Sequence, residues 1–123
     1  MQLRLVFLLP FLATLLVVPV RADTRVGHTI VISKAITDDL YAVGGRLRID
    51  NSVAGDAVLA AGTVAIAGDV DGDVSVAGGK IGISGGVGDD LRAAGGDITL
   101  NGFVTDHAII VGGVVNIAEG SAI

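Results

Sequence analysis

The sequence contains no cysteine and no tryptophan, and its 123 residues include only one tyrosine and three phenylalanines. Without cysteine there is no disulfide, no thiolate metal ligand and no lipid-modified cysteine after a leader, so stacked strands must hold the fold together. Aromatic residues make up 3% of the chain, whereas hydrophobic residues make up 51%. The interior is therefore filled by Val, Ile, Leu and Ala, which suits a narrow tube.

Basic residues are also scarce, because eight Lys and Arg stand against thirteen Asp and Glu, giving a net charge of −5. An acidic chain lacks the basic face that nucleic acid or anionic lipid requires. Catalytic residue types are equally few. The only histidines, His28 and His107, are far apart, and no serine lies in a Gly-x-Ser-x-Gly motif. The composition predicts that the protein is not an enzyme and needs no cofactor.

The N-terminal segment, residues 1–22, has the pattern of a secretory signal peptide. A short basic start is followed by an apolar run from Leu5 to Val18 and then by Val20-Arg21-Ala22, which is typical of a cleavage site. The apolar run is shorter than the ~20 residues of a comfortable membrane span. We expect export to the periplasm, the cell surface or the medium. A retained anchor in the inner membrane is the alternative.

A 17-residue repeat occupies nearly everything after His28. An acidic residue opens successive units at Asp39, Asp56, Asp73 and Asp90, which we call the aspartate ladder, and His107 takes the same place in the last unit. A Gly-Gly or Ala-Gly pair follows at a fixed distance, and an aliphatic-x-aliphatic dyad comes next. A fixed period of this size is typical of a solenoid in which each repeat is one coil.

Apolar residues two apart within each repeat indicate short β-strands with both members facing inward. Three glycine-containing turn signals per repeat, where glycine could supply positive φ, indicate three corners. The predicted fold is all-β: a single-domain, three-sided parallel β-helix over residues 28–123, preceded by a short lead at 23–27. His28–Asp38 is expected to form a partial coil before five full ones, giving a rod about 27 Å long.

The aspartate ladder is the sharpest constellation of chemical groups. Clustered carboxylates are ligands that Ca²⁺ favours, so Asp39, Asp56, Asp73 and Asp90 are candidates for a metal site. The alternative is that each aspartate accepts hydrogen bonds from its own turn, which explains aspartate at a corner without any ion. We favour the alternative.

The ends of the rod suggest self-association, because a β-helix presents open strand edges there and no capping helix is apparent. The last coil is also the least polar one. The residues predicted to make end-to-end contacts are Ile30, Val31, Ile32, Ile109, Val114, Val115 and Ile117. The alternative is a longer solenoid whose further coils would form the cap.

The repeat resembles that of the bactofilin, or polymer-forming cytoskeletal, family. The resemblance rests on the strings that begin at Asp39 (DLYAVGG), Asp56 (DAVLAAG), Asp73 (DVSVAGG) and Asp90 (DLRAAGG), and it covers roughly residues 28–123. It implies a right-handed β-helix that polymerises end to end without nucleotide, as a scaffold at the cell envelope. Envelope proteins or peptidoglycan-associated factors are then possible partners. The signal peptide departs from the family, whose members are cytoplasmic.

Two other functions are compatible with a β-helix. An exported adhesin or binding module would use one repeated face of the rod, although the chain has few repeated aromatic or Asn positions. A left-handed β-helix acyltransferase would need an aliphatic residue every six positions, and the 17-residue period argues against it. The expected function is therefore a structural one.

Overall fold

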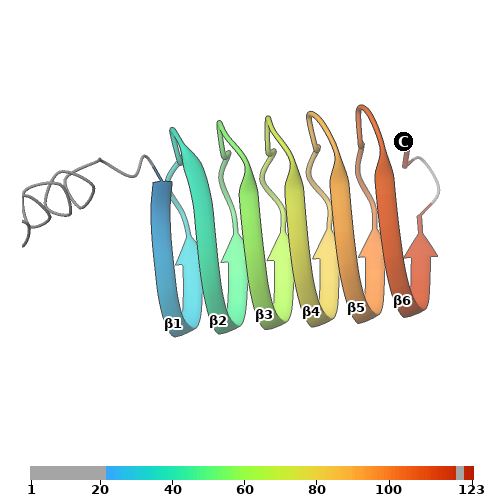
Figure 1. The fold of residues 1–123 in the computed structure, drawn as a ribbon, viewed down its shortest axis with the longest axis horizontal. Helices are drawn as coiled ribbons and strands as arrows, with labels where there is room; N and C mark the ends of the chain where they lie inside the picture. The colour runs from blue at the N-terminus through green and yellow to red at the C-terminus, as the bar shows by residue number, and fades with distance from the viewer. Residues whose placement is uncertain (1–21, 119–120) are drawn as a thin grey trace, which may run out of the picture.

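The computed structural model describes residues 22–118 and 121–123, and it is a β-solenoid of six parallel strands in one sheet (Figure 1). The strands follow one another in chain order from one end of the rod to the other. They are β1 (Ala22–Ile32), β2 (Asp39–Ile49), β3 (Ala57–Ile66), β4 (Val74–Ile83), β5 (Leu91–Leu100) and β6 (Ala108–Ile117). The predicted all-β solenoid, with one coil for each repeat, is confirmed.

The register between neighbouring strands is constant, so each residue pairs with the one that holds the same place in the next repeat. Leu40 pairs with Ala57, and Ala57 in turn pairs with Val74, so equivalent positions form straight rows along the rod. Each strand bends near its middle, at the glycine pair, and runs down one side of the coil and up another (Figure 1). Because the rows are straight, a residue type that recurs in every repeat forms a continuous line along the rod.

Two sides of each coil are the halves of one continuous bent strand, and the third side, which we call the short side, is paired at single residues only. Pairing continues through the first glycine of the corner, as in Gly44 with Ala61, so two predicted strands form one bent strand. The remaining side is held by single bridges that join Ile36, Val53, Val70, Val87 and Val104 in turn. The short side pairs at only one residue per coil because its turns occupy the positions on either side.

The first coil is more complete than the residue pattern indicated. β1 starts at Ala22 and pairs with β2 from Ala22↔Asp39 to Ile32↔Ile49, so residues 23–27 belong to the solenoid and do not form a separate lead. The pattern carried no strand signal here, because Asp23 and Arg25 stand where the next coil has Leu40 and Ala42. Hydrogen bonding to β2 places this segment despite its polar side chains.

The core is a single column of aliphatic side chains inside the coils. Leu40, Ile49, Val53, Leu91 and Ile98 are fully buried, and every buried side chain of the described residues is apolar. No described polar side-chain atom is buried without a hydrogen-bond partner. The narrow interior is filled by small aliphatic groups, as the near-absence of aromatic residues predicted.

The corner glycines are required by close packing between coils rather than by positive φ. None of the described glycines lies in the left-handed φ region. A Cβ atom at Gly85 would overlap the carbonyl oxygen of Gly68 in the preceding coil. At Gly85 the stacking distance leaves no room for a Cβ atom, which corrects the role that we expected for this glycine.

The predicted signal peptide, residues 1–22, lies almost wholly outside the described residues. Among the residues that the structure describes, no helix is long and apolar enough to span a bilayer.

Candidate functional site

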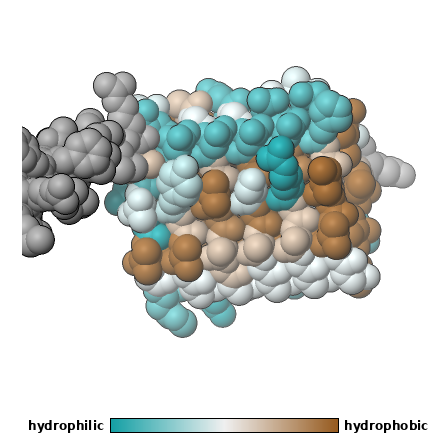
Figure 2. Space-filling view, in the orientation of Figure 1, coloured by the Kyte–Doolittle hydropathy of each residue, from teal (hydrophilic) through white to brown (hydrophobic). Residues whose placement is uncertain are grey.

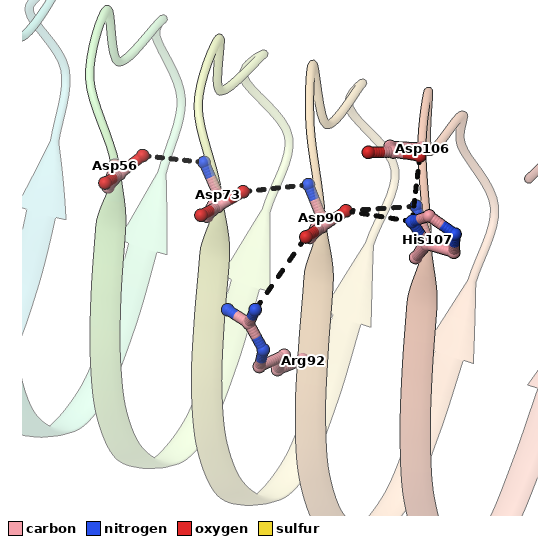
Figure 3. A network of polar contacts seen from close by, with 6 residues as sticks. All are labelled: Asp56, Asp73, Asp90, Arg92, Asp106 and His107. Atoms are coloured by element: carbon pink, nitrogen blue, oxygen red, sulfur yellow. Dashed lines mark hydrogen bonds and ion pairs between the residues drawn. The ribbon is translucent and has the colours of Figure 1, made fainter.

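The aspartate ladder lies along one corner of the rod, immediately before each strand or at its start (Figure 3). Oδ1 of each ladder carboxylate accepts a hydrogen bond from the backbone N–H of the equivalent residue in the next coil. The Asp56 N–H donates to Asp39 over 2.7 Å, and the Asp73 N–H donates to Asp56 over 2.8 Å. His107, which replaces the aspartate in the last coil, donates its N–H to Asp90 over 3.2 Å. The ladder therefore links coils to one another.

The ladder aspartates accept backbone hydrogen bonds, as the alternative to a metal site predicted, but the donors are not the ones expected. Each aspartate serves the turn of the next coil and not its own turn, because parallel stacking brings the next N–H directly beside it. The hydrogen bond is charge-assisted, which makes it stronger than a neutral one. It accounts for aspartate at this corner without an ion.

Two groups of side chains at this corner have ligand atoms within 4.8 Å of one another. They are Asp73–Asp89–Asp90 and Asp90–Asp106–His107. In the second group the His107 Nδ1 lies 2.8 Å from Asp106 and 3.5 Å from Asp90. Arg92 approaches the other oxygen of Asp90 at 3.7 Å (Figure 3). The groups lie at the surface and their members have protein partners, so they do not by themselves define a metal site.

Negative charge accumulates in the second half of this corner. The neighbouring carboxylate of Asp73 raises the pKa of Asp89 above its usual 3.8, and partial desolvation, Asp90 and Asp106 act in the same direction. Like charges close together disfavour ionisation, which explains the direction of the shift. Repulsion along this corner therefore opposes folding at neutral pH.

The C-terminal coil exposes side chains that other coils bury. Val115 and Ile117 continue the interior rows of Ile98 and Leu100. Ile98 and Leu100 are 0% exposed, whereas Val115 is 40% exposed and Ile117 is 54% exposed. Among the residues that the structure describes, β6 is the last strand of the sheet, and no described coil covers these two side chains.

The other predicted contact residues are placed differently. Ile109 and Val114 lie on the outer surface of β6, on either side of its glycine bend, and are exposed. At the opposite end, Val31 is exposed, but Ile30 and Ile32 are buried in the core. The side chains of Ile30 and Ile32 thus line the inside of the first coil and do not form an outer contact surface.

The N-terminal end of the rod is hollow. An open cavity of about 580 Å³ is lined by β1 and the turn after it, including Arg25, Ile30, Ile32 and Ile36. The two ends of the rod are therefore unlike, since one end has a recess and the other presents Val115 and Ile117.

The short side of the last coil departs from the register of the earlier coils. Ala122 bridges Phe103, which is a longer step along the chain than the step from Val87 to Val104. The hydroxyl of Ser121 donates to the Leu100 carbonyl over 3.1 Å. Ser121 stands 17 residues after Val104 in the sequence, but the change of register means that it does not take the place of the earlier valines in the coil. The sequence showed the substitution of valine by serine but not the change of register.

An apolar surface that was not predicted from the sequence lies on the half of each strand that precedes its glycine bend. Its first row contains Val26, Val43, Ala60, Ala77, Ala94 and Val111, and its second row contains Thr24, Tyr41, Val58, Ser75, Arg92 and Ile109. We call these two rows the apolar side. Figure 2 shows them between the hydrophilic aspartate corner and the glycine bends. Applying the 17-residue spacing to outward positions would have found this surface.

The two histidines lie at opposite ends of the solenoid, His28 in β1 and His107 just before β6. The structure does not bring them together, as their sequence positions predicted.

No family model, curated protein or solved structure matches this chain.

Proposed function

We propose that the protein is a non-enzymatic structural protein that assembles end to end through its terminal coils and serves as a scaffold in the bacterial cell envelope. The observation that carries the proposal is the open interior of the C-terminal coil. Val115 and Ile117 belong to interior rows and are nevertheless exposed. A second copy stacking on this end would cover them.

Backbone hydrogen bonds between the terminal strands of two copies would hold the end-to-end contact together. In the described part of the sheet, β6 has a strand partner on one side only, so its other edge offers backbone donors and acceptors to another strand. Covering a Val or Ile side chain contributes about 1.5–3 kcal/mol when the burial is complete, and less for a partly covered one. At the opposite end of the described sheet, β1 likewise has a strand partner on one side only, so the two ends offer two free strand edges.

The cellular setting is part of the same proposal. The signal peptide predicted at residues 1–22 favours export, and the resemblance of the repeat to bactofilins favours a polymer that needs no nucleotide. The main partner is therefore a second copy of the chain. Envelope proteins or peptidoglycan-associated factors would attach to the assembled rod.

The first test is negative-stain electron microscopy over a concentration series, on protein expressed from the complete sequence. We expect filaments that lengthen as the concentration rises. Mass spectrometry of the purified protein tests the leader, with Asp23 expected as the first residue.

The contact is tested with Ile117→Lys, which places a charge on the exposed interior row of β6. The matched control is Thr99→Lys, because Thr99 lies on the outer surface of β5 and is exposed. We expect Ile117→Lys to block assembly while its circular dichroism and melting temperature stay close to those of Thr99→Lys. Normal filaments from Ile117→Lys would show that the C-terminal coil is not the joint.

A second candidate function is a binding module that uses one face of the rod. The exposed apolar side is the observation that favours it. Dispersed short rods at every concentration, together with a folded chain, would support this candidate over end-to-end assembly.

A further inference from the structure

The apolar side is the face of the rod on which exposed aliphatic side chains gather. Val43, Val58, Ile109 and Val111 are all substantially exposed. Arg92 is the only charged residue in its two rows. Continuous apolar surface of this kind is uncommon on monomers and usually marks a contact.

The aspartate ladder runs along one margin of the apolar side (Figure 2). Asp56, for example, stands two residues before Val58, and side chains two apart in an extended chain point to the same face. Among the described residues, Asp90 is the only ladder aspartate with a basic side chain beside it, Arg92 at 3.7 Å and His107 at 3.5 Å. The other ladder carboxylates therefore have no described ion-pair partner next to this apolar surface.

The apolar side is also hollowed. A shallow depression of about 490 Å³ is lined by the alanines of the first row, Ala60, Ala77 and Ala94, and by Ile109 and Val111 of the last coil. The surface that covers this face must therefore be apolar, and it must be convex where the alanines lie.

The hydrogen bonding of the sheet restricts which kind of segment can cover the face. The strands pair with one another in the plane of the sheet, so their backbone groups are not offered to a segment lying on top of it. Such a segment must satisfy its own backbone groups, as an α-helix does. A helix is also convex. The rod, about 27 Å long, matches about 18 helical residues.

We infer that the apolar side and the aspartate ladder together bind a basic amphipathic helix of another protein, which lies along the rod. Its apolar stripe, spaced i, i+3, i+4, i+7, covers the two rows, and Lys or Arg along one flank meets the ladder. The helix belongs to another protein because every element in the described part of the chain is a strand. This inference names a partner for the binding-module candidate and does not require end-to-end assembly.

The two parts of the surface have different roles. Burial of the aliphatic rows contributes most of the affinity, because exposed ion pairs add little to it. The ladder selects the partner by charge. A positive charge beside this corner offsets the repulsion that raises the pKa of Asp89, whereas an acidic helix with the same apolar stripe adds to that repulsion.

Two synthetic peptides test this chemistry. Each is an amphipathic helix of about 18 residues with a leucine stripe, and the flank carries lysine in one peptide and glutamate in the other. Fluorescence anisotropy measures their binding to protein expressed from the complete sequence. We expect the lysine peptide to bind about tenfold or more tightly than the glutamate peptide, and less tightly as sodium chloride is added. Equal binding of the two peptides overturns the inference.

A matched pair of variants tests the location of the contact. Ala77→Lys places a charge in the hollow, and Ala65→Lys makes the same change on the other half of β3, where Ala65 is also exposed. We expect Ala77→Lys to weaken binding of the lysine peptide about tenfold and Ala65→Lys to change it less than about twofold. Equal effects would mean that the peptide does not lie on the apolar side.

The role of the ladder is tested by removing one charge. Asp73→Asn keeps an acceptor for the Asp90 N–H, and Asp97→Asn removes a carboxylate from the other half of β5. We expect weaker binding and a shallower salt dependence for Asp73→Asn only. The same change in Asp97→Asn would mean that the net charge of the rod, and not the ladder, attracts the peptide.

The end-blocked variant Ile117→Lys separates this inference from end-to-end assembly. We expect it to bind the lysine peptide as the unmodified chain does, and a loss of binding would place the peptide at the end of the rod. Filaments of the unmodified chain without peptide binding would leave end-to-end assembly standing and overturn this inference. Lateral self-association that Ala77→Lys abolishes, with no peptide binding, would show that a second copy covers the face.

Discussion

The Oδ1 atom of Asp73 accepts a hydrogen bond of 2.9 Å from the backbone N–H of Asp90, which holds the same place in the next coil of the stack. The same contact recurs from Asp39 to His107. It explains why the repeat opens with a short acceptor side chain. An apolar residue at this position would leave the N–H of the next coil without this acceptor.

Removing this acceptor should cost stability. Asp73→Ala leaves the Asp90 N–H without its partner, and we expect the free energy of unfolding to fall by about 1–3 kcal/mol. Asp73→Asn keeps an Oδ1 acceptor and removes one negative charge, so it should stay close to the unmodified protein. Urea denaturation of the two variants checks this. Equal losses of stability in the two variants would mean that the charge of Asp73, and not its hydrogen bond, stabilises the fold.

Two glycines of the same coil should respond in opposite ways to alanine. A Cβ at Gly85 meets the backbone of the preceding coil, whereas a Cβ at Gly82 meets nothing within 4 Å. Gly85→Ala should destabilise the chain by about 1–3 kcal/mol because the coils must shift apart. Gly82→Ala should be neutral or stabilise by up to about 1 kcal/mol. Thermal melts compare them, and a similar loss in both would contradict the packing argument.

Two residues of one interior row should differ in how much their substitution by alanine destabilises the protein. Leu100 is fully buried, whereas Ile117, in the same row, is 54% exposed. Leu100→Ala should cost about 2–5 kcal/mol, as for other buried aliphatic side chains. In dilute protein, Ile117→Ala should cost clearly less. A large loss for Ile117→Ala that disappears on dilution would instead report burial in an assembled joint.

The acidic corner makes a prediction about pH. The pKa of Asp89 is raised above 3.8, chiefly by Asp73, so the folded chain holds this proton more tightly than the unfolded chain. The contribution of Asp89 to stability is therefore fully present below about pH 3.8 and is lost as the pH rises through the raised pKa. Asp89→Asn should melt like the unmodified protein at low pH and at a higher temperature at pH 7.

Salt provides the control for this effect. The advantage of Asp89→Asn at pH 7 should shrink as sodium chloride is added, because exposed charges are screened. An advantage that does not depend on pH or salt would mean that the substitution acts through packing at the turn.

The 17-residue period was enough to establish the coil length, the inward positions and the parallel stack, because hydrogen bonding between identical coils leaves no other register for Leu40, Ala57 and Val74. It also placed Ile109 and Val114 on the outer surface of the last coil. It could not show that residues 23–27 join β1, because that strand is held by pairing with β2 and not by its own apolar side chains.

The role of each row came from the stacking of the coils in three dimensions. Stacking provides each aspartate of the ladder with a partner in the next coil, buries Ile30 and Ile32, and leaves Val115 and Ile117 exposed. It also puts Val43 and Ala94 on one face. The reason is that burial and hydrogen bonding depend on which coils lie on either side of a residue. A repeat that is nearly the same in every coil does not specify those neighbours.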